Sequence, residues 1–388
     1  MQNEKSELYY NMINAQIKKF QGMKNSDSST LNCYKLLNSG KVRDTYDYND
    51  GGKHILSIAT DKVSGYDVKF YDVIPYKGIF LTLISNYFKE IAGYYKIDTD
   101  IDFIKTQKSV KRIGPNYIGR TIIAKKLQML PFETIVRGYH FGSIVKEYNL
   151  ATSKKSEKGE VFNEFDPFDK QVYKSDYYKE IAGNRVPCGL QLCDKYEKPI
   201  FTPSTKAEYG KHDENITRDQ MREMMFEMGY DASLYDLIES RSLRLYKHIN
   251  DVYNRFGLTM MDTKFEWGID PNNPKVPILG DEVGTPDSSR IVLTESLATR
   301  KPISMDKQVL RDFMTSLKAA NEWNPGDTPP EIPADLVLKM QQNYATLVSL
   351  LYTKFNDTTR QKELVLPNNL RDIVSCYAQK ILAENGGK

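Results

Sequence analysis

The segment Leu258–Trp267 constrains the fold more than any other stretch, because its charged and apolar residues alternate. Successive side chains of a β-strand point to opposite faces of the sheet. The alternation therefore predicts a strand with Asp262, Lys264 and Glu266 on one face. The other face would carry the residues between them, which are Met261, Thr263, Phe265 and Trp267. A Pro/Asn turn and a second strand, Val276–Val283, follow, so the two segments predict an antiparallel hairpin.

The register of this hairpin decides what its charged face can do. If the turn is centred near Pro271–Asn272, Asp281 lies roughly opposite Asp262, and such cross-strand partners are about 5 Å apart at Cβ. Clustered carboxylates repel one another unless a cation or a substrate neutralises them. A set of ligands made only of oxygen atoms suits Mg²⁺, which is commonly bound together with nucleotide phosphates. Two alternatives stay open: a solvated polar face, or a register one residue away that brings in Glu282 instead.

Two other segments are candidates for binding anions. In the turn Gly40–Asp44, a glycine lets backbone amides approach an anion while Lys41 and Arg43 add positive charge, although an ordinary surface turn explains the pattern at least as well. The segment Arg137–Ser143 ends a strand and opens a helix, which can form a phosphate site or a merely capped helix with a structural ion pair. With the carboxylate patch, these segments suggest an enzyme that handles ATP and a second phosphate-bearing substrate.

The remaining pattern predicts a mixture of strands and helices. Strands dominate residues 33–125, with a hairpin turn at Asn49–Gly52. Polar residues 150–198 carry no clear period and are interpreted as a partly mobile surface insertion. Two further strands are expected at Thr121–Leu127 and Glu133–Gly138, and a linker at 25–30. Helices are expected at 9–20, 81–92, 143–148, 217–229, 233–256, 336–355 and 369–383.

Composition excludes some functions. The net charge is only +3, from 54 basic and 51 acidic residues, which argues against a nucleic-acid binder driven by bulk charge. No apolar run approaches the roughly 18 residues of a membrane span, and the polar start lacks a secretory signal. The four cysteines are scattered, as in a protein with reduced thiols. A cytoplasmic protein without membrane or nucleic-acid partners is therefore expected, and its oligomeric state stays open.

Seven motifs appear in the order of a known family. The chain resembles the phosphoribosylaminoimidazole-succinocarboxamide synthases, or SAICAR synthetases, of de novo purine biosynthesis over about residues 33–355. The motifs are SGKVRD (39–44), ATDKVSGYD (59–67), VRGY (136–139), FTPSTKA (201–207), HDEN (212–215), MDTKFE (261–266) and DEVGTPDSSR (281–290).

The resemblance implies a reaction and an architecture. The carboxylate of carboxyaminoimidazole ribonucleotide (CAIR) would be joined to the amine of L-aspartate, giving SAICAR, ADP and phosphate. Because a carboxylate is a poor electrophile, ATP would first convert it into an acyl phosphate. The implied fold is α+β, with an ATP-grasp/kinase-like arrangement of two lobes. Its parts would be an N-terminal extension and linker (1–32), a small β-rich lobe over ATP (33–125), a larger lobe with the substrate and metal site (126–330) and C-terminal helices (331–388).

The resemblance also implies roles for individual residues. Catalytic roles fall to Asp262, Lys264, Lys206 and Asp213, the last two on a mobile loop. ATP would be bound by Lys41, Arg43, Lys126, Gln128 and Met129, and Mg²⁺ by Glu266 and Asp281. The ribonucleotide, chiefly its phosphate, would be held by Arg137, Ser143 and Arg290. Candidates for the L-aspartate site are Ser64, Asp67 and Lys77.

Two competing functions are weighed against this one. A small-molecule kinase on a related fold would use the same metal and glycine turn but leave the phosphate on a hydroxyl. A nucleotide-sensing module without catalysis is disfavoured because Asp262, Lys264, Glu266 and Asp281 are all intact. The chain departs from the family pattern at Gly65–Tyr66 and in the length of the stretch between Tyr148 and Phe201, and residues 1–30 and 357–388 have no counterpart.

Overall fold

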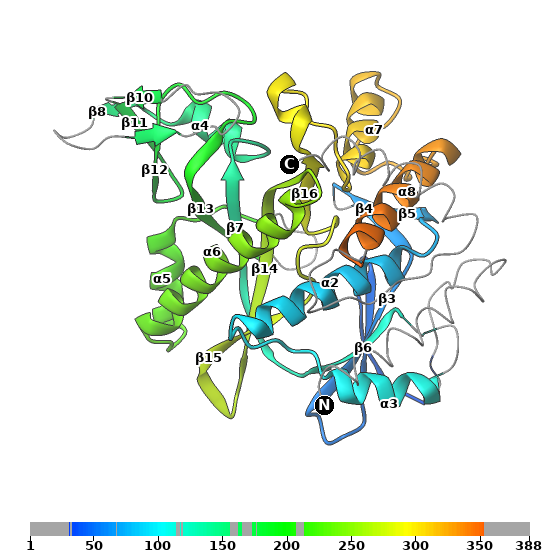
Figure 1. Ribbon diagram of the computed structural model, residues 1–388. Coiled ribbons are helices and arrows are strands. Elements are labelled where there is room, and N and C mark those ends of the chain that lie inside the picture. The colour runs from blue at the N-terminus through cyan, green and yellow to red at the C-terminus, as the bar shows by residue number, and fades with distance from the viewer. Residues whose placement is uncertain are drawn as a thin grey trace.

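The computed structural model describes residues 31 and 33–352, except 67, 114–116, 118, 156–161, 165–172, 176 and 207–212. The helices expected at 9–20 and 369–383 and the linker at 25–30 lie outside the described residues, as does Asp67. The fold is α+β (Figure 1).

A small antiparallel sheet has the strand order β1-β2-β3-β6. Its strands are β1 (Leu36–Ser39), β2 (Arg43–Asp47), β3 (His54–Ala59) and β6 (Thr121–Lys125). The predicted turn between β2 and β3 is confirmed, with positive φ at Asn49, Gly51 and Gly52. On β3, Leu56 and Ile58 pack in a small core that also contains Ile113 at the end of α3 (Phe103–Ile113), a helix the sequence did not predict. The alternate residues of β3 face helix α2 (Lys77–Tyr94).

A larger five-stranded sheet has the order β13-β7-β14-β15, with β16 also paired to β14. Its strands are β7 (Gln128–Tyr139), β13 (Lys195–Thr205), β14 (Leu258–Asp270), β15 (Asn273–Gly280) and β16 (Ser289–Leu293). The expectation that Gln128–Pro131 separates two strands is wrong, because β7 already begins at Gln128 and runs through Pro131. The proline lies where the pairing of β7 with β14 shifts register, so its missing N–H interrupts no regular ladder.

The main hydrophobic core lies between the larger sheet and the helices α2, α6 (Ala232–Asn254) and α8 (Ala334–Leu351). This core contains Phe88 of α2, Ile249 of α6 and Leu347 of α8, together with Phe265 and Trp267 of β14. Figure 1 shows α2 running between the two sheets. The boundary predicted at 125/126 separates the sheets, but α2 precedes it and packs into the larger core.

The predicted helices agree well with the observed ones. The segment 81–92 lies within α2, and 233–256 corresponds to α6. The capping box of α5 (Arg218–Glu227) is present, with Thr217 and Gln220 bonded reciprocally. The remaining helices are α4 (Ile144–Leu150), a 3-10 helix (Thr294–Thr299) and α7 (Gln308–Ala319). None of the helices in the described part of the chain combines the length and apolar character of a membrane span.

The stretch 150–198 contains strands that the sequence did not predict. They are β8 (Lys154–Lys155), β9 (Phe162–Glu164), β10 (Tyr173–Ser175), β11 (Tyr177–Ile181) and β12 (Asn184–Pro187). They lie with α4 at one edge of the molecule (Figure 1). Ile181 and Val186 pack with Tyr148 of α4 in a separate small core. Strands of two to five residues are too short to produce a detectable alternation. A further hairpin, β4 (Lys62–Gly65) with β5 (Val68–Val73), follows the small sheet.

Candidate active site

The hairpin of β14 and β15 forms as predicted, but its register differs. Asp270 pairs with Asn273 around the expected turn, whereas the next residue, Ile269, pairs with Pro277. This irregularity shifts every later pair by three residues, so Glu266 lies opposite Gly280 and Asp281 follows directly. The expected pairing of Asp262 with Asp281 is therefore wrong. Asp281 belongs beside Glu266 instead.

Asp262 has different neighbours from those expected. It pairs with Arg137 of β7 on one side and with Arg290 of β16 on the other. The pairing with β16 shifts between Met260 and Asp262, so Met261 is an extra residue on β14. A bulge of this kind reverses which face a side chain occupies. Met261 accordingly packs in a different core from Phe265 and Trp267, and the prediction that they share a face is wrong.

Two arginines and two hydroxyl groups gather around Asp262. We call this group the arginine cluster; it consists of Arg137, Arg290, Asp262, Thr202 and Ser143. Asp262 accepts hydrogen bonds from Arg137 at 3.1 Å and from Arg290. Arg137 also donates to Thr202 Oγ1 at 3.0 Å and to Ser143 Oγ at 3.2 Å. Two guanidinium groups thus share one carboxylate, and the cluster carries surplus positive charge.

Local geometry supports the arginine cluster. Ser143 occupies the N-cap position of the short helix α4, but its hydroxyl makes no capping bond among the described residues and is bonded to Arg137. Gly142 has φ +78°, and a Cβ there would lie 2.6 Å from Arg290 Nη1, so the glycine leaves room for the guanidinium. Burial lowers the pKa of Arg137, whereas Asp262 raises that of Arg290.

A carboxylate cluster lies at the other end of the charged face; it contains Glu133, Glu266, Asp281 and Glu282, with Lys206, Lys264 and Arg43. Lys264 Nζ contacts Glu133 at 2.5 Å and Glu266 at 3.5 Å, and Lys206 contacts the second oxygen of Glu266. Arg43 Nη1 donates to Asp281 at 2.8 Å, and its Nη2 lies 3.4 Å from Glu282. Four carboxylates face three cations here, so the surplus charge is negative.

The electrostatics of the carboxylate cluster follow from this crowding. Burial and the charge of Asp281 raise the pKa of Glu266. Burial would also raise the pKa of Asp281, but Arg43, Lys264 and Lys206 lower it to about 2. Burial opposes the charged form of Lys264, yet Glu133 and Glu266 outweigh it and raise its pKa. Lys264 therefore stays protonated at neutral pH and cannot act as a base.

The donor set of the carboxylate cluster fits Mg²⁺ better than a soft metal. Among the described residues, no three His, Cys, Asp or Glu side chains gather closely enough to hold an ion by themselves. Mg²⁺ commonly takes only one or two carboxylates and completes its shell with water and substrate phosphates. Glu266 and Asp281 supply such a pair, because Asp281 directly follows the residue opposite Glu266.

Comparison with known proteins settles the family. The SAICAR synthetase family model matches residues 36–326. A phosphoribosylaminoimidazole-succinocarboxamide synthase of Corynebacterium glutamicum is 34% identical over 325 residues, covering 83% of this chain and 94% of that protein. One from Geobacter metallireducens is 36% identical over 316 residues, covering 80% and 92%.

The chain belongs to the SAICAR synthetase family. A solved structure agrees: the SAICAR synthase of Saccharomyces cerevisiae, complexed with SAICAR, superimposes with a TM-score of 0.64 and 29% identity. That match covers 86% of this chain and all of the yeast chain.

The residues expected to line adenine lie in the segment Lys126–Met129, called the strap below, which leads from β6 into the first residues of β7. Lys126, Gln128 and Met129 are exposed, and Met129 is 41% accessible although it is apolar. A Cβ on Gly280 would lie 3.0 Å from Met129 Cε, which places Met129 beside the end of β15 and thus close to Asp281 in the chain. Lys41 is exposed in its turn, whereas Arg43 is directed at Asp281 and Glu282.

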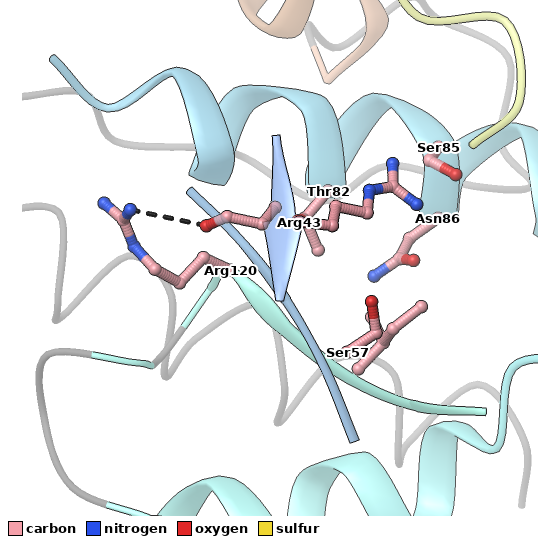
Figure 2. A pocket seen from close by; sticks show the side chains of 8 residues that line it. Arg43, Ser57, Thr82, Ser85, Asn86 and Arg120 are labelled. Carbon is pink, nitrogen blue, oxygen red and sulfur yellow. Dashed lines mark hydrogen bonds between the residues drawn. The ribbon is translucent and has the colours of Figure 1, made fainter. Parts of the chain in front are cut away.

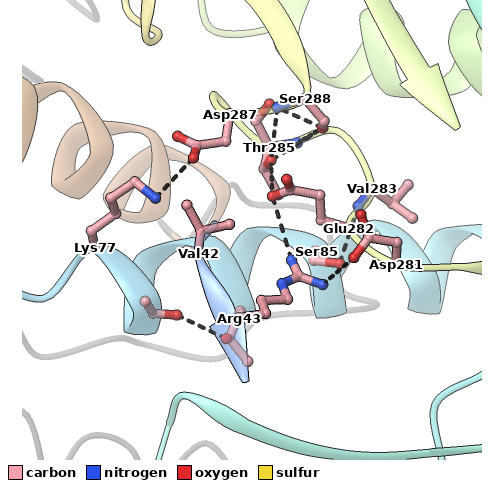
Figure 3. A network of polar contacts seen from close by, with 12 residues as sticks. Val42, Arg43, Lys77, Ser85, Asp281, Glu282, Val283, Thr285, Asp287 and Ser288 are labelled. Atoms are coloured by element: carbon pink, nitrogen blue, oxygen red, sulfur yellow. Dashed lines mark hydrogen bonds and ion pairs between the residues drawn. The ribbon is translucent and has the colours of Figure 1, made fainter. Parts of the chain in front are cut away.

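Two of the three candidates for the L-aspartate site, Ser64 and Lys77, belong to a buried network, of which Figure 3 shows Lys77 and Asp287. Lys77 is fully buried, and its Nζ lies 2.8 Å from Asp287. Lys307 Nζ lies 3.6 Å from the same carboxylate and donates to Ser64 Oγ at 3.4 Å, while Tyr344 donates to Asp287 at 2.6 Å. Sequence reasoning missed Lys307 and Tyr344, which belong to no motif. Asp287, by contrast, lies within the last motif.

Lys206 and Asp213, the two residues expected on a mobile loop, are separated by residues that lie outside the described part of the chain. Lys206 follows β13 and reaches Glu266, with its side chain 46% exposed. Asp213 is exposed, and residues 207–212 between them are outside the description. The structure thus brings Lys206 to the carboxylate cluster.

Proposed function

We propose that this chain joins L-aspartate to CAIR with cleavage of ATP to ADP and phosphate, in purine biosynthesis. One observation carries this proposal: on a single strand, the surroundings of Asp262 have an excess of positive charge and those of Glu266 an excess of negative charge. Four residues of strand span about 13 Å, a length suited to a ribonucleotide whose phosphate and reacting carboxylate lie at opposite ends. The names of the curated relatives and the SAICAR bound to the yeast enzyme support this choice.

The arginine cluster would bind the ribonucleotide phosphate. Its two guanidinium groups already share one carboxylate, so a phosphate would supply the missing negative charge. Ser143 would add a hydroxyl to the same site. Because Asp262 holds both arginines, its proposed role is to orient them toward the substrate.

The carboxylate cluster would face the ATP phosphates. Glu266 and Asp281 would hold Mg²⁺, which would neutralise phosphate charge when bound. Met129 and the strap would lie along the adenine, with Lys41 near the phosphates, and the small sheet would cover the nucleotide. Lys206 would leave Glu266 when the cation arrives and contact a phosphate instead.

The chemistry would proceed in two steps. A carboxylate oxygen of CAIR attacks the γ-phosphorus of ATP, and ADP leaves. The amine of L-aspartate then attacks the acyl carbon, loses a proton and expels phosphate. Lys264 lies between Asp262 and Glu266 on β14 and stays protonated, so its proposed role is to stabilise negative charge on the reacting carboxylate. Ser64, with the network of Lys77 and Lys307, would line the L-aspartate site.

The decisive experiment measures whether ADP release depends on both co-substrates. With ATP and CAIR alone, ADP should form slowly, and L-aspartate should accelerate it strongly with stoichiometric phosphate and a new amide. Succinate, which lacks the amine, should give no product. An Asp281→Asn variant purified identically controls for a contaminating ATPase. Rapid ADP release without L-aspartate, with phosphate retained on the substrate, would indicate a kinase and refute the proposal.

A further inference from the structure

Arg43 is held rigidly at the start of β2. The carbonyl of Val42 accepts from both Thr60 N and Thr60 Oγ1, at 2.9 and 3.0 Å. The amide of Gly40 donates to Arg43 O at 2.7 Å, and a Cβ on Gly40 would lie 2.9 Å from that oxygen. The SGKVRD turn therefore serves to fix the backbone of Arg43.

The side chain of Arg43 crosses from the small sheet to the carboxylate cluster. It shares the α2-facing side of the sheet with Ala59, its partner on β3. There it lines a small cavity with Ser57, Thr82 and Asn86 (Figure 2). Its side chain is only 16% exposed. A guanidinium that is enclosed in this way has little freedom to swing toward a ligand.

The turn that Arg43 reaches is strained and crowded with charge. Asp281 has φ +49°, a left-handed conformation that is uncommon for residues other than glycine. Arg43 contacts both Asp281 and Glu282 (Figure 3), and Thr285 Oγ1 donates to Glu282 at 2.6 Å. The amide of Val283 donates to Ser85 Oγ of α2 at 3.1 Å. The turn is thus contacted from two other elements, α2 and β2, and Arg43 of β2 bonds directly to both of its carboxylates.

We propose that Arg43 is a positioning residue that orients the Asp281–Glu282 turn and ties the small sheet to it, rather than a ligand of the nucleotide phosphates. The charge of Arg43 is already balanced by two carboxylates, which leaves none for a phosphate. Its removal would leave the buried carboxylate of Glu282 beside the partly exposed carboxylate of Asp281 with no arginine between them. This inference rests on the proposed function, because it assigns Asp281 to the metal and nucleotide end of that site.

A binding and kinetic comparison separates the two roles of Arg43. In Arg43→Gln, the affinity for ADP, measured by calorimetry without divalent cations, should change less than about threefold. In steady-state kinetics, kcat should fall at least about tenfold while the KM for ATP changes little. Arg43→Lys should recover part of kcat. The exposed Arg255→Gln serves as the matched control. Metal-free ADP binding weakened tenfold or more in Arg43→Gln would make Arg43 a phosphate ligand and overturn the inference.

A double-mutant cycle tests the positioning role without activity. Urea unfolding of Arg43→Gln should show a clear loss of stability that becomes smaller in an Asp281→Asn background, because only Glu282 then remains as a partner of Arg43. Additive losses would contradict the coupling. A wild-type protein that makes no SAICAR would refute the proposed function. The double-mutant cycle would still measure the energetic coupling between Arg43 and Asp281, so the two failures can be distinguished.

Discussion

The two ends of the charged face of β14 differ in how their charges are balanced. Around Asp262, two arginines meet one carboxylate, and all three side chains lie largely inside the protein. Around Glu266, carboxylates outnumber cations, and one of the cations, Lys206, is 46% exposed. In the proposed function, the first end would bind an anion and the second end a cation that displaces Lys206. The register of β14 places these two excesses of charge four residues apart, so one strand would supply both halves of the proposed site.

The largest effect is expected at the carboxylate cluster. Asp281→Asn removes a charge that Arg43, Lys264 and Lys206 keep ionised with a pKa of about 2, so kcat should fall at least about 100-fold, whereas the melting temperature should fall by only a few degrees as these contacts are lost. Steady-state kinetics at saturating Mg²⁺ and thermal melting measure the two quantities, with the exposed Asp251→Asn as control. Near-normal turnover at saturating Mg²⁺ would remove Asp281 from the metal site.

A smaller and more selective effect is expected at the arginine cluster. Loss of a charge-assisted contact costs roughly 1.5–3 kcal/mol, so Arg137→Ala should raise the KM for CAIR about tenfold or more and leave the KM for ATP nearly unchanged. The exposed Arg222→Ala should alter neither constant. Equal weakening of both substrates would mean that Arg137 acts through the fold and that the two ends are not independent.

The smallest effect concerns acid sensitivity near the arginine cluster. His140, buried against Tyr196 with a 2.9 Å contact, has its pKa lowered by burial to about 4. The unfolded chain binds a proton at His140 more readily than the folded protein does. The contribution of neutral His140 to the free energy of unfolding is therefore fully present above about pH 6.5. It is lost as the pH falls toward 4, by up to about 3 kcal/mol.

Melting curves can isolate this contribution. Between pH 7.5 and pH 5, the melting temperature of the wild type should fall several degrees more than that of His140→Gln, whose amide can still accept from Tyr196. Equal shifts in the two proteins would show that His140 does not titrate in this window. Asp281 should contribute nothing here, since it stays ionised throughout.

Local features were predictable wherever the signal lay within a few residues. The hairpin turn at Asn49–Gly52, the capping box at Thr217 and the stripe of α6 all followed from short-range sequence rules and are observed. The short strands of 150–198 and helix α3 were missed. The former are too brief for periodicity to be visible, and no capping signal was recognised for the latter.

The sequence by itself determined which chemical groups this protein has: a strand with alternating charges, a glycine turn, and motifs that mark the SAICAR synthetase family. Only the tertiary structure decided which of these groups meet. A three-residue shift beside the turn moved Asp281 from Asp262 to Glu266, and a bulge at Met261 reversed part of a face. Arg43 reached the carboxylates across 238 residues of sequence. Bulges and long-range pairs are set by packing against other elements, and no local pattern encodes that packing.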